Sequence, residues 1–553
     1  MTLKASVPTS LPPADKDSVL AVLERTCKTF PDRSAFTNQG VSLTYAELDR
    51  LSSDLAAYFQ HRTPLQPGDR IALMLPNLLQ FPIALFAALK AGLIVVPTNP
   101  FYSERELRHQ LSDSGARAIV YLDMLGDRVE AVIGETQLEI LIESSVGDMH
   151  TTGRRVLMNA VAKYLKKKIP TFELPQAIPF LDAVEQGYEC VIDRLDPEPD
   201  DVALLQYTMG TTGVAKGAML SHANLVANMR QVRTVLDERD EQGLPLFEEG
   251  RQLVIAPLPL YHIYAFTAHC LCMMAVGNHS VLITDPRDTD QLIKVLNRYR
   301  FNGIVGLNTL FQNLLEHPGF NKVDFRDLRL TLSGGAALTR TVAERWARVT
   351  GCEVLEAYGL TEASPAVAMN PLGRIKRGTV GRAVPDTEVR IQDEEGDALA
   401  PGEVGELCVR GPQVFQGYWH APQATADSFT PDGWLKTGDL AWRDEDGYIK
   451  IVDRKQDLIL VSGFNVYPNE IENVLLNHPG VAACAAVGVP DSHSGEIVKA
   501  FVVRRDPDAT EAELDAWCRS NLAGYKVPKI IEFCDALPLT PVGKILRREL
   551  RGQ

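Results

Sequence analysis

The chain has 553 residues, of which 45% are hydrophobic and 23% charged, so we expect two or more folded domains. These proportions are typical of a globular protein and exclude a largely disordered, collagen-like or disulfide-stapled chain. Lys and Arg number 56 against 71 Asp and Glu, giving a net charge of −15. Such a surface repels polyanions, which disfavours a general nucleic-acid binder and requires a local positive site for any phosphate-bearing ligand.

The cysteines indicate a reducing compartment. There are nine of them, an odd number, and none forms a CxxC pair; the two closest are Cys270 and Cys272. The first twenty residues lack the apolar core of a signal peptide. The longest apolar run, residues 81–97, is interrupted by a lysine and a glycine and predicts a buried helix followed by a strand. We therefore expect a soluble cytosolic protein.

In chain order, residues 17–60 show helical patterns, and from residue 71 short apolar strands alternate with helices. The expected strands are 71–75, 95–96, 118–121, 202–206, 253–256, 281–284, 303–306 and 329–332. This alternation predicts a large N-terminal domain, residues 1–453, built of α/β subdomains with mostly parallel sheets.

The texture changes in the last third of the chain. Residues 378–453 contain β-branched runs split by Gly, Pro and Asp, which predict a small β-rich subdomain. After a hinge near 453–457, a smaller and mobile α+β C-terminal domain is expected over 454–553. Its predicted elements are strands at 458–461, 482–489 and 499–503 and helices at 468–477 and 510–522.

Residues 150–172 are basic and contain no acid. The basic residues are Arg154, Arg155, Lys163, Lys166, Lys167 and Lys168, while Leu157, Val161, Tyr164 and Leu165 fall on one face of a helix. This pattern has two interpretations. A solvated connector is favoured, and weak peripheral contact with an anionic membrane, at the inner face of the cell membrane, is the alternative.

The most informative stretch is YTMGTTGVAKG, residues 207–217, which follows a predicted strand. Its glycines allow backbone N–H groups to turn toward a phosphate, its threonines add hydroxyl donors, and its lysine adds positive charge. It differs from a Walker A loop because Ala215 precedes Lys216 and Gly217 follows it. Taken alone, a polar turn between two strands would explain the stretch equally well.

Six further motifs follow in order. They are SGGAAL at 333–338, YGLTEASP at 358–365, DGWLKTGD at 432–439, Asp453-Arg454, SGFN at 462–465 and PVGKI at 541–545. Together with the loop, these motifs resemble the adenylate-forming superfamily of acyl-CoA synthetases, peptide-synthetase adenylation domains and luciferases. The resemblance covers nearly the whole chain and is strongest to bacterial long-chain fatty-acid–CoA ligases.

The resemblance implies roles for individual residues. The nucleotide site would comprise Thr208, Gly210, Thr211, Thr212, Gly213 and Lys216 at the triphosphate, Gly335, Ala336, Tyr358, Gly359 and Thr361 toward the adenine, and Asp439 with Arg454 at the ribose. Thr208 and Glu362 would hold Mg²⁺, and Lys544 would be the lysine needed for adenylation. His262 would be a gate beside the acyl site. The loop of Ser462, Gly463 and Phe464 would reach the site when coenzyme A reacts, and Gln456 would be the hinge residue.

The implied chemistry explains these residue types. A carboxylate attacking a phosphate brings two anions together, so a metal ion and a cationic side chain must neutralise the charge. A glutamate suits a hard metal ion, and an aspartate can accept hydrogen bonds from both ribose hydroxyls. Two positions depart from the family pattern: Met209 replaces a small residue, and Gln456 replaces a charged one. We expect Met209→Gly to relieve crowding and to improve the kinetics with ATP.

The implied reaction is an ATP-dependent, AMP-forming ligation of a fatty acid to coenzyme A, with Mg²⁺ as cofactor. One alternative is a ligase that passes its acyl group to a carrier-protein thiol. A second is an inactive nucleotide- or acyl-binding protein, against which the presence of Glu362 and Lys544 argues. A homodimer remains open as the assembly.

Overall fold

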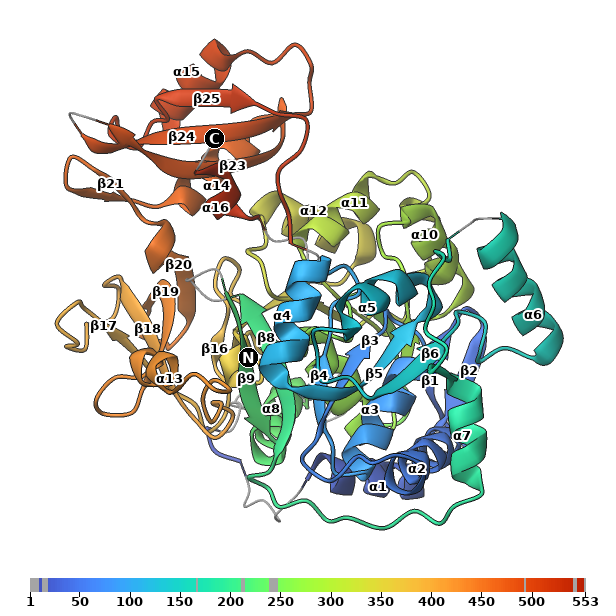
Figure 1. The fold of residues 1–553 in the computed structure, drawn as a ribbon. Helices are drawn as coiled ribbons and strands as arrows, with labels where there is room; N and C mark the ends of the chain where they lie inside the picture. The colour runs from blue at the N-terminus through green and yellow to red at the C-terminus, as the bar shows by residue number, and fades with distance from the viewer. Residues whose placement is uncertain are drawn as a thin grey trace.

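The computed structural model describes residues 9–11, 18–165, 168–209, 214–237, 247–491, 494–540 and 545–551. In Figure 1, two large sheets and their helices form one body, a small sheet lies beside it, and the C-terminal residues form a separate body. The described residues form four sheets in all.

The first large sheet has seven strands in the order β7-β6-β5-β3-β4-β8-β9. Their bounds are β3 (Arg70–Met74), β4 (Ile94–Pro97), β5 (Ala116–Leu122), β6 (Ile140–Ser144), β7 (Ile178–Pro179), β8 (Val202–Met209) and β9 (Ala215–Ser221). Neighbouring strands run parallel except for the antiparallel pair of β8 and β9. The accompanying helices are α3 (Gln80–Lys90), α4 (Glu104–Ser114), η1 (Asp123–Leu125), α5 (Gly126–Ile133) and α7 (Phe180–Tyr188). The buried branched runs of these strands suit a sheet that is covered on both faces.

The second large sheet has nine strands in the order β16-β15-β14-β13-β12-β10-β11-β1-β2. Their bounds are β1 (Ser34–Asn38), β2 (Val41–Thr44), β10 (Leu253–Ala256), β11 (His279–Leu282), β12 (Gly303–Gly306), β13 (Leu330–Ser333), β14 (Val354–Gly359), β15 (Ala366–Met369) and β16 (Arg382–Ala383). The central strands are parallel, and the pairs at both ends are antiparallel.

The helices that accompany this sheet include two that begin at well-formed caps. Their bounds are α1 (Val19–Thr29), α2 (Tyr45–Arg62), α8 (His222–Leu236), α9 (Ile263–Ala265), the π-helix η3 (Phe266–Met273), η4 (Met274–Val276), α10 (Thr289–Arg298), α11 (Asn308–Glu316), η5 (Phe320–Lys322), α12 (Arg340–Thr350) and η6 (Thr361–Ala363). Both α2 and α8 start at a capping box, in which the cap residue and the third helical residue satisfy each other's backbone N–H.

The N-terminal region corrects one expectation. Residues 17–60 contain the helices α1 and α2, but β1 and β2 lie between them as a hairpin. Gln39 and Gly40, between the strands, both have positive φ, at 47° and 84°, which is the pattern of a type I′ hairpin turn. The strand β1 also pairs with β11, which is more than 200 residues away in the sequence. Pairing with a distant strand therefore outweighs the local helical pattern.

The third sheet is antiparallel and contains β17 (Glu388–Gln392), β18 (Gly405–Arg410), β19 (Leu435–Arg443) and β20 (Ile449–Arg454), with the helix α13 (Pro422–Ser428) nearby. The 3-10 turn η7 (Lys455–Asp457) follows β20. The fourth sheet contains β21 (Ile459–Val461), β22 (Phe464–Val466), β23 (Val481–Asp491), β24 (Gly495–Arg504) and β25 (Ile530–Phe533), with α14 (Pro468–Leu476), α15 (Glu511–Asn521) and α16 (Arg547–Leu550). A large α/β part and a smaller α+β part confirm the predicted fold class.

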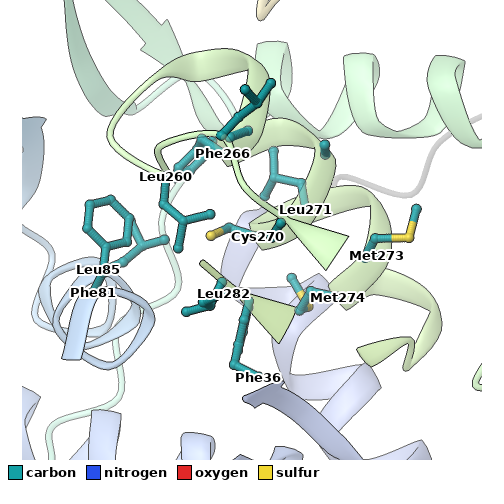
Figure 2. Packing of buried hydrophobic residues seen from close by; sticks show 14 of the residues in the cluster. Phe36, Phe81, Leu85, Leu260, Phe266, Cys270, Leu271, Met273, Met274 and Leu282 are labelled. Atoms are coloured by element: carbon teal, nitrogen blue, oxygen red, sulfur yellow. The ribbon is translucent and has the colours of Figure 1, made fainter. Parts of the chain in front are cut away.

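The two large sheets share one hydrophobic core, whereas the fourth sheet has its own. Buried residues of both large sheets, among them Ile71 of β3 and Ile255 of β10, belong to a single cluster. Figure 2 shows part of it, where Phe81 and Leu85 of α3, Cys270 of η3 and Phe36 of β1 gather in one place. The second cluster includes Leu475 of α14 and Val502 of β24. The predicted buried helix and strand over 81–97 are confirmed as α3 and β4.

Two further features concern the cysteines and the length of the apolar helices. All nine cysteines are free, and seven are buried, with Cys190 and Cys534 partly exposed. Over the described residues, no helix is both long enough and apolar enough to cross a membrane.

The basic segment forms the helix α6 (Thr152–Ala160), continued by a π-turn, η2 (Val161–Leu165). No residue of either element is buried, and α6 stands away from the sheets at the edge of the molecule in Figure 1. Leu157 is 64% exposed, Tyr164 71% and Leu165 78%. The apolar side chains of the helix therefore point into solvent.

Candidate functional site

A cavity of about 1020 Å³ lies where β8, β9, β14 and β19 meet the turn that follows β20. The predicted site residues that line it are Thr208, Lys216, His262, Gly335, Tyr358, Gly359, Thr361, Glu362, Arg454 and Gln456. They come from motifs spread over about 250 residues of sequence, so the fold brings most of the predicted nucleotide site together.

The remaining predicted residues fall into two groups. Gly210, Thr211, Thr212, Gly213 and Lys544 lie outside the described residues, as does the side chain of Met209. Ala336, Asp439 and the loop 462–464 are described by the structure but do not line the cavity. Asp439 nevertheless contacts two residues of the wall.

The ribose end of the predicted site is a tight cluster of Asp439, Tyr358 and Arg454. The Tyr358 hydroxyl donates to Oδ2 of Asp439, and Nε of Arg454 lies 3.0 Å from Oδ1. Asp439 and Arg454 also face each other across the β19–β20 ladder, and Asp439 is only 4% exposed. Burial, followed by the nearby Asp439 carboxylate, raises the pKa of Tyr358 and keeps it a phenol donor. Both oxygens of Asp439 thus have protein partners, and lone pairs remain for a further donor.

At the other end, Glu362 contacts a residue that the sequence did not single out. Glu362 lies on η6, and its Oε1 accepts a hydrogen bond of 2.6 Å from the hydroxyl of Tyr418. The Tyr418 ring lies 5.4 Å from Nζ of Lys216, within the range of a cation–π interaction. Tyr418 stands in the stretch QGYWH, which matches no motif of phosphate or metal chemistry. Its contacts with Glu362 and Lys216 are evident only from the fold.

Two positions of the predicted site require glycine, each for a different structural reason. A Cβ on Gly359 would lie 2.2 Å from the carbonyl oxygen of Pro365, so close backbone approach requires glycine there. Gly335 has φ of +78°, and a Cβ added to it would meet no atom within 4 Å, so it is required by backbone conformation and leaves open space. That space faces the cavity.

One part of the cavity wall is apolar. It includes buried side chains from α8, η3 and neighbouring strands and loops: Val232, Leu258, Ala268, Cys272, Leu307 and Met369. His262 lines the cavity and caps α9, with its Nδ1 accepting from the backbone N–H of Tyr264 at 3.3 Å. The cavity therefore joins a polar end, which carries the motif residues, to an apolar arm.

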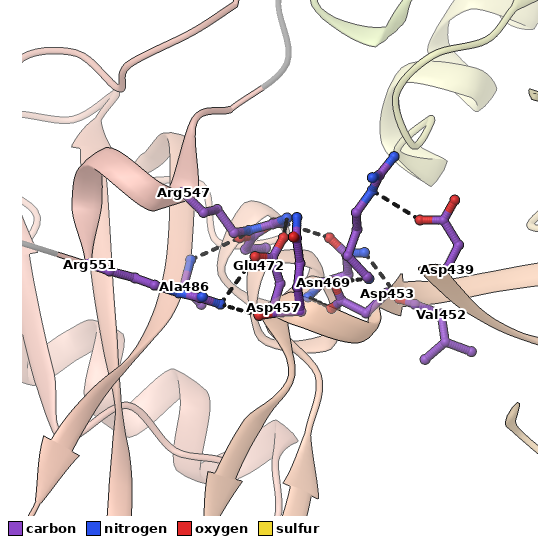
Figure 3. Close-up of polar contacts among 11 residues, drawn as sticks. Asp439, Val452, Asp453, Asp457, Asn469, Glu472, Ala486, Arg547 and Arg551 are labelled. Atoms are coloured by element: carbon purple, nitrogen blue, oxygen red, sulfur yellow. Dashed lines mark hydrogen bonds and ion pairs between the residues drawn. The ribbon is translucent and has the colours of Figure 1, made fainter. Parts of the chain in front are cut away.

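The turn at 455–457 is held by a cluster of charged side chains, most of them at least partly buried (Figure 3). Arg547 contacts both oxygens of Glu472, at 3.1 and 2.8 Å, and lies 3.3 Å from Asp457. Arg551 donates to the carbonyl of Gln456 at 2.9 Å and contacts Asp457 at 3.1 Å. Gln456 and Asp457, at the C-terminal end of the predicted hinge, are therefore connected to α16 and to the residue that follows it.

Asp453 belongs to the same cluster. It accepts from the backbone N–H groups of Asn469 and Arg454, both at 2.8 Å. Burial raises its pKa to about 6, while these hydrogen bonds and the charge of Arg547 act in the opposite direction.

The predicted coenzyme A loop lies elsewhere on the C-terminal body. Ser462 and Gly463 form the turn between β21 and β22, with φ of 52° and 82°. Phe464 is 56% exposed, and its ring centroid lies 4.9 Å from that of Tyr525. In this conformation, the loop does not contribute to the cavity wall formed by the described residues.

Comparison with known proteins gives matches over nearly the whole chain. Residues 23–419 match the family model of AMP-binding enzymes, and residues 470–544 match that of the AMP-binding enzyme C-terminal domain. The long-chain-fatty-acid–CoA ligase of Salmonella typhi is 48% identical over 550 residues, covering 99% of this chain and 97% of the relative. The long-chain-fatty-acid–CoA ligase of Bacillus subtilis is 38% identical over 551 residues, covering 98% and 96%. The crystal structure of ATP-bound MatB from Rhodopseudomonas palustris superposes with a TM-score of 0.81 at 29% identity, covering 97% of this chain and 99% of that one.

Proposed function

Because this chain belongs to the AMP-binding enzyme family, we propose that it is an ATP-dependent ligase that joins long-chain fatty acids to coenzyme A. The observation that carries the proposal is the single cavity in which a polar end, with Thr208, Lys216 and Glu362, continues into an apolar arm. A fatty acid has both characters in one molecule. Its carboxylate belongs beside the phosphates, and each buried methylene of its chain contributes roughly 0.8 kcal/mol.

The reaction has two steps. In the first, a carboxylate oxygen attacks the α-phosphorus of ATP, the bond from this phosphorus to the bridging oxygen breaks, and pyrophosphate leaves. In the second, the sulfur of coenzyme A loses its proton and attacks the acyl carbonyl carbon. The bond to the phosphate oxygen then breaks, and AMP leaves with that electron pair.

The first step needs positive charge and orientation. Lys216 and the loop 210–213 would hold the triphosphate, and Lys544 would offset the charge of the two reacting anions. Tyr358 and the open space at Gly335 would receive the adenine, with Ala336, Gly359 and Thr361 near it. Asp439 would accept from the ribose hydroxyls while its pairing with Arg454 keeps it oriented.

The donor set at the polar end fits Mg²⁺. This ion prefers oxygen ligands and is commonly held by one or two carboxylates together with substrate phosphates. The hydroxyl of Thr208 and the carboxylate of Glu362 both reach the cavity and would hold it. When bound, it would neutralise phosphate charge as the carboxylate approaches.

The second step requires a different arrangement of the C-terminal part. On this proposal the chain divides at 453–457 into domains 1–453, with its β-rich part at 378–453, and 454–553. Rotation about Gln456 would withdraw Lys544 and bring Ser462, Gly463 and Phe464 to the thiol's path. The exposure of Phe464 and its distance from the cavity wall support the need for such a movement.

A coupled assay of AMP release across a series of fatty acids tests the substrate class. We expect activity with long chains, dependent on ATP and free coenzyme A, and little with acetate. Activity confined to short or aromatic acids would contradict the proposal. Acyl transfer to a carrier protein but not to free coenzyme A would favour the carrier-dependent ligase.

The two half-reactions test the assigned residues. Lys544→Ala should lose several orders of magnitude in acyl-adenylate formation, since about 1.4 kcal/mol is tenfold in rate. It should still form thioester from pre-made acyl-adenylate and coenzyme A. Lys529→Ala, which removes an exposed lysine of the same domain, is the matched control and should retain both steps.

Gln456→Pro should show the opposite pattern, because a proline stiffens the turn. Adenylation should be largely kept and thioester formation lost. If Lys544→Ala loses both steps equally, the lysine serves both poses and the two-pose mechanism is wrong.

The helix α6 supports a further proposal, that the enzyme contacts anionic membrane at the cytoplasmic face. Leu157 of α6 and Tyr164 and Leu165 of η2 are exposed, together with Arg154, Lys163 and Lys168. Each basic residue near such a surface contributes about 1 kcal/mol. Replacing Lys163, Lys166, Lys167 and Lys168 by Gln should abolish salt-sensitive sedimentation with anionic vesicles. Equal sedimentation of the two proteins would instead favour the interpretation of the segment as a solvated connector.

A homodimer is compatible with this function, and sedimentation velocity across a concentration series distinguishes it from a monomer.

A further inference from the structure

Tyr418 contacts the two charged side chains to which the proposed function gives the metal ion and the phosphates. Its hydroxyl donates to Oε1 of Glu362 at 2.6 Å, and its ring lies 5.4 Å from Nζ of Lys216. Glu362 and Lys216 are about 150 residues apart in the sequence, and Tyr418 is distant from both. All three line the same cavity. One side chain therefore connects the metal-binding candidate to the phosphate-binding candidate.

The backbone around Tyr418 makes the same connection. On one side, the N–H of Trp419 donates to the carbonyl of Gly217 at 2.8 Å, and the N–H of Met219 donates to that of Gly417 at 2.9 Å. These bonds join the segment to β9, the strand that carries Lys216. On the other side, the N–H of Phe415 donates to the carbonyl of Glu362 at 2.8 Å. The segment 415–419 thus bridges β9 and η6.

The side chain of Tyr418 is held in place independently of any ligand. Its ring packs edge-on against Phe415, with centroids 4.9 Å apart, and its N–H donates to the hydroxyl of Thr425 at 2.9 Å. In the bond to Glu362 the phenol O–H is the donor, because a carboxylate oxygen accepts. Since an ionised carboxylate has about four lone-pair sites, this bond orients Glu362 and still leaves sites for a metal ion.

We propose that Tyr418 is a positioning residue of the nucleotide site, whose hydroxyl orients Glu362 for the metal ion and whose ring orients Lys216 for the phosphates. The inference rests on the proposed function, because that function assigns the two ligands. Groups that orient a metal ligand in this way typically change metal affinity ten- to a hundredfold when they are removed. The hydroxyl and the ring have separate tasks, so two substitutions can separate them.

The test is calorimetric titration of ATP into each variant, with Mg²⁺ and with EDTA. Tyr418→Phe keeps the ring and should weaken ATP binding about tenfold or more in Mg²⁺, with no change in EDTA. Tyr418→Leu removes the ring as well and should add a loss of about fivefold in EDTA, because the cation–π contact with Lys216 disappears. In steady-state assays, the Mg²⁺ concentration for half-maximal AMP release should rise in Tyr418→Phe, while turnover recovers at saturating Mg²⁺.

Tyr448→Phe is the matched control. The Tyr448 hydroxyl donates to the carbonyl of Arg374 at 3.0 Å, and Lys376 and Arg382 lie over its ring, at 5.2 and 4.6 Å. It has the same kinds of contact but does not line the cavity, so its ATP binding should match the wild type in both buffers.

Two outcomes would overturn the inference. If Tyr418→Phe binds ATP normally in Mg²⁺, the hydroxyl does not orient Glu362. If it loses affinity equally in Mg²⁺ and EDTA, the residue supports the fold rather than the metal site. A wild-type protein that binds ATP with Mg²⁺ but forms no thioester would instead contradict the proposed function. The comparison of ATP binding between the wild type and the Tyr418 variants would still test the inference.

Discussion

At the scale of one residue, Asp453 shows how a carboxylate at a junction between sheets can be both buried and partnered. Its side chain is only 1% exposed, and it accepts two backbone N–H groups beside the turn at 455–457. The removal of water from around the carboxylate outweighs these partners, so its pKa lies above the ordinary value. A raised carboxylate pKa links folding to proton binding.

We predict that Asp453 makes the stability of the enzyme rise as the pH falls from 8 to 5. The folded pKa, about 6, lies above the unfolded value of 3.8, so the folded state binds the proton more tightly. This contribution is fully present below pH 3.8 and lost as the pH rises through 6. The two pKa values give a gain of about 1.4 kcal/mol between pH 8 and pH 5, relative to Asp453→Asn. Urea titrations of both proteins at each pH measure it, and a pH-independent difference between them would contradict the prediction.

At the scale of elements, the packing of α7 on α2 depends on a residue without a side chain. Gly187 lies in α7, and a Cβ on it would be 1.8 Å from the backbone oxygen of Asp54 in α2. Backbone cannot move away as a flexible side chain can. The close contact of these two helices therefore requires glycine at this position, despite the low helix propensity of glycine.

Gly187→Ala should lower the free energy of unfolding by about 1–3 kcal/mol, the usual range for overpacking a close contact. Gly134→Ala is the matched control, because a Cβ on Gly134 meets no atom within 4 Å and this residue caps the end of α5, a helix of the same sheet. That variant should stay within about 0.5 kcal/mol of the parent. Equal stability of the two variants would show that α7 shifts at little cost.

At the scale of the whole molecule, the two largest hydrophobic clusters of the described residues lie in two parts of unequal size. The larger core joins both large sheets, and the smaller one lies among β21, β23, β24, α14 and α15. Leu85 and Leu475 are fully buried in the larger and the smaller core, respectively. Because each side chain packs within its own cluster, a cavity made in one core should leave the other core intact.

We predict that Leu475→Ala and Leu85→Ala affect different thermal transitions. Each should cost about 2–5 kcal/mol in its own core, the usual range for buried leucine. Differential scanning calorimetry should therefore show the smaller transition lowered by Leu475→Ala and the larger one by Leu85→Ala. A single transition that both variants lower equally would mean that the two parts unfold together.

The sequence predicted the secondary structure best where the signal is local. The strands over 253–256 and 303–306 have the predicted bounds because turn residues flank each short apolar run. The hairpin of β1 and β2 was missed because its partner, β11, is far away in the sequence. Tyr418 was missed for the same reason, since its importance depends on Glu362 and Lys216, which only the fold brings to it. The pairing of Asp439 with Arg454 was implied by family resemblance, and no pattern of spacing could have supplied it.

Because most thiols are buried, the two partly exposed cysteines can serve as selective labelling sites. Burial raises the pKa of thiols such as Cys27 and Cys408 to about 12, so they react slowly with maleimides. Cys190 follows α7 in the larger body, and Cys534 follows β25 in the smaller one; both are partly exposed. Maleimide dyes should therefore attach mainly to these two thiols. Energy transfer between the two dyes would then report the distance between the bodies, in the unmodified sequence and during turnover.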